Sequence, residues 1–449
     1  MCLGSEDSSE WDRRRSPAQY NRATMRERVG VCLVSLSLLA ASCTAPGSIA
    51  RVGPSPTPSQ TPPPSPTLGV GVTPTVQTLT VWVPPIFAGQ SGAQDGSLLA
   101  GRVEQYEAAH PSVKVIVRVK DAQGPGGLLE ALQAASRVAP AALPAAIALD
   151  PDSLRIAAQQ QLILPLNGLV PDTSASDWFD YALQASQVDG VLYGIPFASE
   201  AIVLVYRTDR YESPPDSWND LINARQITLF PAGDPSAILT LVQYLALGGG
   251  LADPSGLPAL DAGVLSQVLA HYDSAQSAGV LPLSALQYIS FEDTWEALAG
   301  GRAASATAPF SAYFKLLDTA TLSALPLPGI AEAGFTMTRP WSWAVVGSDP
   351  IQDPQVADLL AWLSQPDFSG PWTLSLGLLP TTRSALAFWP SDSTSASASD
   401  LISSARAMPS SELLETYGPV LHQAVEAVLN QSENPESAAQ HAAEQVSQP

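Results

Sequence analysis

The sequence predicts an α/β fold of two lobes, in which each lobe has a mostly parallel sheet flanked by helices. Three observations support this prediction. Strands and helices alternate from residue 79 to residue 166, as in a parallel sheet with crossover helices. The segment 189–206 then interrupts the alternation with two strands in succession. Finally, residues 77–449 are too many for one hydrophobic core.

The first expected elements lie between residues 79 and 166. Residues 79–83 (Leu-Thr-Val-Trp-Val) are typical of a buried strand, and residues 113–119 alternate apolar and polar side chains as a second strand does. A helix at 98–109 ends at His110-Pro111, because proline lacks the amide proton that a helix needs. The series continues with a helix at 128–136, a strand at 145–149 and a helix at 154–160.

The later elements mix strands and helices. Segment 189–206 predicts a turn, a strand, a proline-interrupted crossing and a second strand. Ser217, followed three residues later by Asp220, indicates a helix N-terminus. The remaining expected elements are helices at 261–278, 294–300, 354–363, 410–429 and 435–446, and strands at 302–307 and 341–346.

The N-terminal part resembles a bacterial lipoprotein signal peptide that begins at Met25, which we expect to be the true start. Two arginines precede an apolar core at residues 29–39, which is too short to span a bilayer. The core leads into Leu39-Ala40-Ala41-Ser42-Cys43, which resembles a lipobox, so we expect Cys43 to carry the lipid. The alternative is an ordinary signal peptide or a short buried segment.

A stalk is expected after this cysteine. Residues 44–76 contain nine prolines among serines and threonines, so they cannot bury apolar surface and favour extended polyproline II. At about 3.1 Å per residue such a segment reaches on the order of 100 Å. A lipid, a spacer and a folded body together predict a protein that works on the outer face of a membrane.

Composition excludes several classes of partner and site. The chain has 21 basic and 42 acidic side chains, so its net charge of −21 repels nucleic acid and anionic lipid headgroups. The three cysteines lie at positions 2, 32 and 43, which leaves residues 77–449 without a disulfide. The four histidines are isolated and no G-x-S-x-G elbow occurs, so we expect no metal, no cofactor and no enzyme activity.

Nearly all of residues 77–446 resembles, in order, the extracellular solute-binding proteins of ABC importers, specifically family 1, the sugar-binding, maltose-binding-protein-like group. The matching pieces are Leu79–Val83, Tyr106–Val119, Ala145–Leu166, Asp189–Tyr206, Trp218–Leu221, Trp295–Ala304, Leu325–Gly329, Gly377–Pro380, Met408-Pro409 and Pro435–Ala439.

This resemblance implies a type II periplasmic-binding-protein-like fold with a ligand in the cleft between two hinged lobes. By the family pattern the first lobe is about 77–198 plus 303–340, and the second is about 200–300 plus 345–446. Segment 197–201 is the first hinge. The lobes close on the ligand, and an ABC permease recognises the closed form. We expect the protein to be a monomer.

Candidate ligand contacts are flat apolar rings for the C–H face of a sugar, and carboxylates for its hydroxyl groups. Trp82 lies on the first strand, where a core role is equally expected. Trp341 and Trp343 alternate with Ser342 and should share one face of a strand. Phe310, in Ala308-Pro309-Phe310, occupies the place where the family carries a stacking tryptophan.

Four acidic residues are the other candidates. Glu200 falls at the hinge, where the family motif holds a ligand-contacting carboxylate. Asp150 and Asp152 follow a strand end, at the edge where open α/β sheets present binding loops, although capping of the next helix by Asp152 is an equal alternative. Asp234 matches a family position that carries glutamate before proline, but Ser236 replaces the tyrosine that should follow, which suggests a different or smaller ligand.

The sequence therefore predicts a lipid-anchored receptor that captures a carbohydrate and delivers it to an importer. Polyamine and peptide ligands stay open. Two other classes also stay open: a surface scaffold or adhesion lipoprotein on the same fold, and a glycoside hydrolase with paired carboxylates in the cleft.

Overall fold

The computed structural model describes residues 76–88, 94–166, 177–316, 321–330, 333–347, 354–391 and 393–447. The expected signal peptide, Cys43 and nearly all of the expected stalk lie outside these residues. The chain divides into Met1–Gly71 and Val72–Pro449, and the structure described below belongs to the second unit. Within the described ranges no helix combines the length and apolarity that crossing a bilayer requires.

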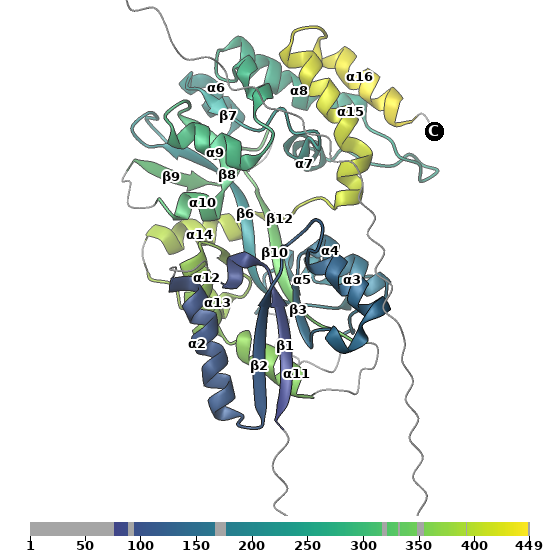
Figure 1. The fold of residues 1–449 in the computed structure, drawn as a ribbon. Helices are drawn as coiled ribbons and strands as arrows, with labels where there is room; N and C mark the ends of the chain where they lie inside the picture. Colours follow the sequence, from purple (N-terminus) through teal and green to yellow (C-terminus); the bar gives the residue numbers. More distant parts are fainter. Residues whose placement is uncertain are drawn as a thin grey trace, which may run out of the picture. The chain divides into compact units, whose positions relative to one another are not determined.

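One mixed sheet, with strands in the order β2-β1-β3-β10-β6-β8-β7, organises the second unit (Figure 1). The pairs β1–β2, β1–β3 and β7–β8 are parallel, whereas β10 runs antiparallel to both β3 and β6, and β6 runs antiparallel to β8. The strands are β1 (Gln77–Val83), β2 (Val113–Val119), β3 (Ala146–Leu149), β6 (Ile195–Arg207), β7 (Thr228–Leu229), β8 (Ser305–Pro309) and β10 (Thr336–Val345).

Shorter strands complete the β structure. β9 (Leu322–Leu325) and β11 (Leu379–Pro380) pair with β6, and β12 (Ala405–Ala407) runs parallel to β10. β4 (Gln187–Val188) and β5 (Val191–Leu192) form a separate hairpin. The positive φ of Gly190, 77°, fits the tight turn between them, since glycine adopts this conformation without a steric penalty.

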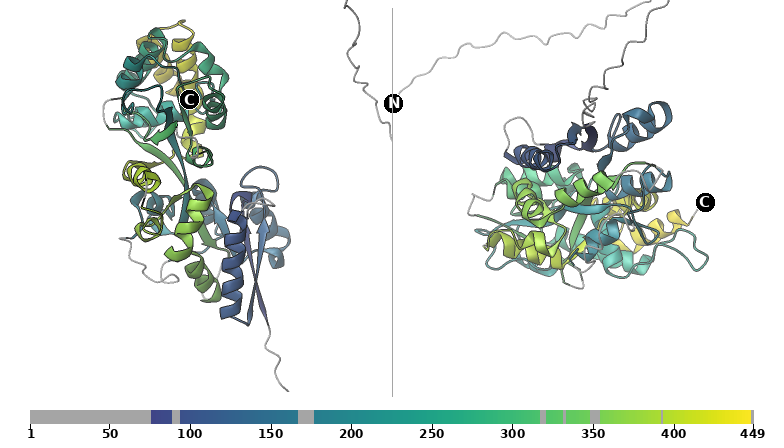
Figure 2. Two further views of the ribbon diagram at one scale, coloured as in Figure 1. Left: turned by 90° about the vertical axis from the view of Figure 1, so that its left-hand side faces the viewer. Right: turned by 90° about the horizontal axis from the view of Figure 1, so that it is seen from below.

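The first lobe is built on both faces of β1, β2 and β3. Alternate residues of β1 point to opposite faces: Val81 lies in one apolar cluster and Trp82 in the other. The Val81 face is covered by α2 (Gln94–Ala109), α11 (Pro354–Leu363) and α12 (Pro366–Leu376), and Figure 2 shows the purple α2 beside the green α11 and α12. The Trp82 face is covered by α3 (Leu128–Val138) and α4 (Pro151–Gln159).

The second lobe contains the largest apolar cluster, which surrounds β8 and the C-terminal half of β6. Its principal helices are α6 (Trp218–Ala224), α7 (Ile238–Ala246), α8 (Ala262–Ser277), α9 (Phe291–Ala299), α15 (Ser411–Leu429) and α16 (Pro435–Val446). The remaining helices among the described residues of the chain are α1 (Pro85–Ala88), α5 (Asp180–Ala185), α10 (Phe310–Phe314), α13 (Arg383–Leu386) and α14 (Ser393–Ser403), with 3-10 turns at Pro140–Ala142 and Leu283–Gln287.

Two strands, β6 and β10, run from one lobe into the other (Figure 1). In β6, Phe197 and Ala198 belong to the first lobe's core, whereas Ala201 belongs to that of the second. In β10, Met337 packs in the second lobe and Trp343 in the first. Packing therefore changes sides within the segment 197–201, where the sequence places the first hinge.

The structure differs from the sequence-based expectations in the sheet and in the assignment of segments to lobes. Antiparallel pairs at β10 and β6 make the sheet mixed, because these strands join the lobes directly instead of through crossover helices. The segment 303–340 was expected in the first lobe, but β8 packs in the second. Conversely, α11 and α12, expected in the second lobe, pack in the first.

Helix boundaries follow the caps. Ser217 and Asp220 form the expected capping box of α6. α9 begins at Phe291 instead of residue 294, since a second capping box formed by Ser290 and Asp293 precedes it. α4 begins at Pro151, because proline at the first helical position needs no amide partner.

Candidate ligand-binding cleft

A cavity of about 230 Å³ lies between the two lobes, beside the crossing strand β10. The first lobe contributes α4, and the second contributes α7, the start of α15 and the loop after β12, while α5, whose buried residues pack in the second lobe's core, adds the region of Gln184. The cavity is lined by Pro151, Asp152, Arg155, Gln184, Ala185, Gln187, Ile238, Thr338, Arg339, Ala407, Met408, Pro409, Ser410, Ser411 and Leu414. None of these lining side chains is aromatic.

Asp150 sits behind this cavity as the N-cap of α4. One carboxylate oxygen accepts hydrogen bonds from the amides of Asp152 (3.2 Å) and Ser153 (3.3 Å), and the other accepts from the Ser153 hydroxyl (2.7 Å). Arg339 Nη2 lies 3.3 Å from Asp150 Oδ1. Asp150 is 1% exposed, so its buried charge is balanced by four donors, and it orients the Arg339 guanidinium.

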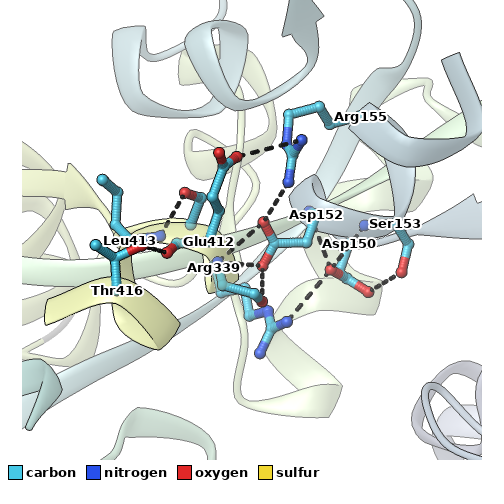
Figure 3. Close-up of polar contacts among 10 residues, drawn as sticks. Asp150, Asp152, Ser153, Arg155, Arg339, Glu412, Leu413 and Thr416 are labelled. Atoms are coloured by element: carbon cyan, nitrogen blue, oxygen red, sulfur yellow. Dashed lines mark hydrogen bonds and ion pairs between the residues drawn. The ribbon is translucent and has the colours of Figure 1, made fainter. Parts of the chain in front are cut away.

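Asp152 connects the two lobes (Figure 3). Its Oδ2 accepts hydrogen bonds from the Ser411 amide (3.1 Å) and from the Ser411 hydroxyl (2.5 Å). Ser411 is the first residue of α15, so the carboxylate of one lobe binds a free N–H at the helix N-terminus of the other. Asp152 therefore contacts the cleft, while Asp150 is the residue that caps α4.

Two arginines and one further acid complete the polar cluster in Figure 3. Arg155 lies 3.9 Å from Asp152 Oδ1 and 3.8 Å from Glu412 Oε2, both at the long end of ion pairing. The Arg339 side chain is 35% exposed and engages Asp150 through one nitrogen, which leaves further guanidinium donors for another partner. The cluster can therefore offer both donors and acceptors to a polar ligand.

Glu200 stands directly opposite Arg339 in the β6–β10 register. Its Oε1 accepts hydrogen bonds from the amides of Ala201 (2.9 Å) and Ser311 (3.2 Å), and its Oε2 accepts from the Ser311 hydroxyl. Burial raises the pKa of Glu200, and the hydrogen bonds from Ser311 and Ala201 oppose that rise. The carboxyl group is thus held at the crossing, but by the second lobe instead of by the polar cluster around Asp152.

Phe310, beside Ser311, is 1% exposed. Its ring packs against Tyr313 and Phe314, with centroids 5.9 Å away in both cases. In this structure the ring therefore fills the second lobe's core and presents no free face for stacking.

The three candidate tryptophans lie in different surroundings. Trp343 is fully buried and stacks on Phe197 at 4.3 Å, and Trp82 is 3% exposed in the core of the opposite face. Trp341 and Trp343 both pack against the first lobe's cluster that contains Phe197, because the register shift beside Trp341 places the extra residue in β6 and leaves the alternation of β10 intact. Trp341 alone is half-buried, and its ring meets Phe87 edge-on at 5.5 Å.

Asp234 lies in a turn before α7, away from the lining of the cleft. Its carboxylate accepts hydrogen bonds from the Ser236 amide (2.9 Å) and hydroxyl (2.6 Å). The chain then passes through Ala237, whose φ of 42° places it in the left-handed region. The turn is packed against α15, where a Cβ at Gly418 would lie 2.7 Å from the Ser236 carbonyl oxygen.

Sequence reasoning missed Arg339, Arg155 and Ser411. A signal existed for Arg339, because an arginine in an otherwise buried strand requires a partner. Ser411 could be placed only with the fold, since its contact with Asp152 spans 259 residues. Among the described residues no cluster of three or more histidine, cysteine or acidic side chains is arranged to hold a metal ion.

The comparisons with known proteins identify the family. A model of the bacterial extracellular solute-binding protein matches residues 101–400. The chain belongs to this family. Members of the family are binding proteins and not enzymes. No curated protein sequence matches this solute-binding protein.

Solved structures share its fold. The cyclic alpha-maltosyl-1,6-maltose binding protein of Arthrobacter globiformis has a TM-score of 0.66 at 18% identity, covering 82% of this chain and 97% of that one. The sugar-binding protein MalE of Xanthomonas citri also has a TM-score of 0.66, at 20% identity, covering 82% and 96%. Maltose-bound MalE3 of T. maritima has a TM-score of 0.61 at 16% identity, covering 82% and 98%. These likenesses confirm the expected two-lobed fold.

Proposed function

We propose that the protein is a lipid-anchored receptor that captures a carbohydrate between its lobes and delivers it to the permease of an ABC importer. The observation that supports this most directly is the cavity at the crossing strands, since its lining comes from both lobes and includes charged side chains. A ligand that contacts both sides binds the closed form best, so it shifts the population toward closure. The sugar-binding relatives make a carbohydrate the first ligand class to test.

Several chemical features of the cleft fit a polyhydroxylated ligand. Arg339 can donate hydrogen bonds to ring hydroxyls, Asp152 can accept from them, and the amides of Gln184 and Gln187 can do both. The lining contains no aromatic ring, so its apolar contacts would come from aliphatic side chains such as Ile238, Met408 and Leu414. Half-buried Trp341 is the remaining candidate for an apolar contact at the edge of the crossing.

Anchoring through Cys43 and a proline-rich stalk would place the lobes on the outer face of the cell membrane. This part of the proposal depends on the sequence alone. Metabolic labelling with a fatty-acid analogue, in the wild type and in Cys43→Ser, tests it directly. Label that persists in the variant would contradict lipidation at this residue.

A saccharide panel followed by thermal unfolding of the full chain tests the receptor function. A bound ligand at 100 times its Kd adds about 2.7 kcal/mol to the free energy of unfolding, so the Tm should rise with concentration. Arg339→Gln and Asp152→Asn should each reduce this rise, because both side chains line the cavity, while Arg118→Gln, at an exposed position on β2, should retain it. A Tm unchanged across the panel would contradict carbohydrate binding.

A non-transport scaffold on the same fold is the second candidate. It is favoured by the non-aromatic lining of the cavity and by the Asp152–Ser411 contact, which joins the lobes directly. A scaffold should show no shift with any saccharide, polyamine or peptide. A glycoside hydrolase would instead release product from the saccharide panel.

A further inference from the structure

A second cavity, of about 370 Å³, lies at the end of the second lobe that is remote from the cleft. Three arginines line it: Arg207 at the end of β6, Arg210 in the following turn, and Arg302 before β8. Gln226 adds an amide group. Arg207 is seven residues along β6 from Glu200, or about 23 Å of extended strand, so this cavity is separate from the crossing.

The concentration of positive charge here is unusual for this chain. Residues 77–449 contain only 14 lysines and arginines, and the whole chain has a net charge of −21. Arg207 is paired with Asp209, through contacts of 3.2 and 3.4 Å. Arg210 and Arg302 are exposed, and the structure shows no ion pair for either of them among the described residues. The four charged groups at this cavity therefore sum to about +2.

The backbone of Arg302 is fixed where the chain turns back beside the cavity. The residue follows α9 and Gly301, whose φ of 74° allows the chain to turn back toward β8. Its amide donates to the Ala297 carbonyl oxygen at 2.8 Å, which fixes the backbone. The guanidinium carbon lies 6.0 Å from the centre of the Tyr288 ring, at the outer limit of a cation–π contact.

Like charges that share a cavity repel each other, and a bound anion relieves that repulsion. Guanidinium groups suit oxyanions, because their planar fork of N–H donors matches phosphate and carboxylate oxygens in a bidentate geometry. The overall negative charge of the chain disfavours an extended polyanion or a membrane surface, which would also meet its acidic side chains. A small ion contacts only the cavity and therefore avoids repulsion by these acidic side chains.

We propose that Arg207, Arg210 and Arg302 form a binding site for a small tetrahedral oxyanion, phosphate or sulfate, which is independent of the cleft between the lobes. Binding is electrostatic, so it weakens as ionic strength rises.

Isothermal titration of the full chain with inorganic phosphate, and separately with sulfate, at low ionic strength tests the site. The wild type should bind one ion saturably, and the double variant R210Q/R302Q should bind it at least tenfold more weakly. Arg137→Gln is the matched control, because it removes an exposed arginine from the first lobe and should leave binding unchanged. The double variant R210K/R302K keeps the positive charge but loses the planar guanidinium donors, so it should bind the ion with intermediate affinity. It provides the test if R210Q/R302Q fails to fold.

Absence of saturable binding to the wild type, or equal affinity in wild type and R210Q/R302Q, would overturn the proposal. Sedimentation with phosphatidylglycerol vesicles distinguishes the two sources of phosphate. Arginine-dependent vesicle binding without binding of the free ion would refute the small-ion site and identify a lipid headgroup as the ligand. The saccharide-induced rise in Tm should be the same in R210Q/R302Q and wild type, so this test is independent of the receptor function.

Discussion

Replacing Asp152 with alanine should loosen the connection between the lobes. Asp152 contacts Ser411 through two hydrogen bonds to a carboxylate, at 3.1 and 2.5 Å. Hydrogen bonds to charged groups contribute about 1.5–3 kcal/mol each when buried. Here the Asp152 side chain is 19% exposed and Ser411 is exposed, so water replaces part of the loss. We therefore expect a cost of about 2 kcal/mol for the pair.

Hydrogen exchange at the Ser411 amide measures this contact directly. Asp152 is its acceptor in the structure, and the amide is the first of α15, which has no partner within its own helix. A loss of about 2 kcal/mol corresponds to roughly 30-fold faster exchange. Asp152→Asn keeps an oxygen acceptor and should give a smaller increase.

Glu412→Gln is the matched control, because this 76% exposed side chain meets Arg155 only at 3.8 Å. It should change exchange at Ser411 by less than about 0.5 kcal/mol. Equal exchange rates in wild type and Asp152→Ala, corrected for intrinsic rates, would refute the inferred link between the lobes.

Three further predictions concern the crossing and the cores. Burial raises the pKa of Glu200, so its carboxyl group favours the folded state below about pH 4.5, and this contribution is lost as pH rises through the folded-state pKa. Urea unfolding should therefore show Glu200→Gln gaining stability relative to wild type as pH increases; a difference independent of pH would contradict a raised pKa. Trp343→Ala should lower the free energy of unfolding by about 3–5 kcal/mol, because it empties a fully buried site, and a loss below 1 kcal/mol would show that the ring is not packed there. Gly418→Ala should cost about 1–3 kcal/mol, since the new Cβ meets the Ser236 carbonyl oxygen at 2.7 Å; an unchanged Tm would mean that α15 does not press on this turn.

Local patterns in the sequence predicted local structure well. Residues 79–83, predicted as a buried strand, lie in β1, and the capping residues Ser217 and Asp220 correctly predicted the start of α6. The cap of α4 was assigned to the wrong aspartate: Asp150 holds it, because Pro151 takes the first helical position. Two acidic residues flanking a proline offer the same local chemistry, so only the start of the helix decides between them.

Non-local features could not be read in the same way. The sequence of β8 predicts a strand, but it does not predict the lobe in which this strand packs. Trp343 and Trp341 have similar neighbours in sequence and pack against the same cluster, yet one is buried and the other half-buried, because different parts of the fold cover the two rings. The polar cluster depends on residues 150–155, 339 and 411–412, and it therefore forms only when three distant segments meet.

The interleaving of β6 and β10 between the lobes determines the order in which the chain can fold. The first lobe includes α11 and α12, which follow most of the second lobe along the chain, and the second lobe needs α15 and α16 from the extreme C-terminal part. The first core is complete during synthesis only after α12 has emerged, and the second only after α16 has emerged. Contacts across such long sequence separations slow folding, so neither lobe can reach its native packing during most of the chain's synthesis.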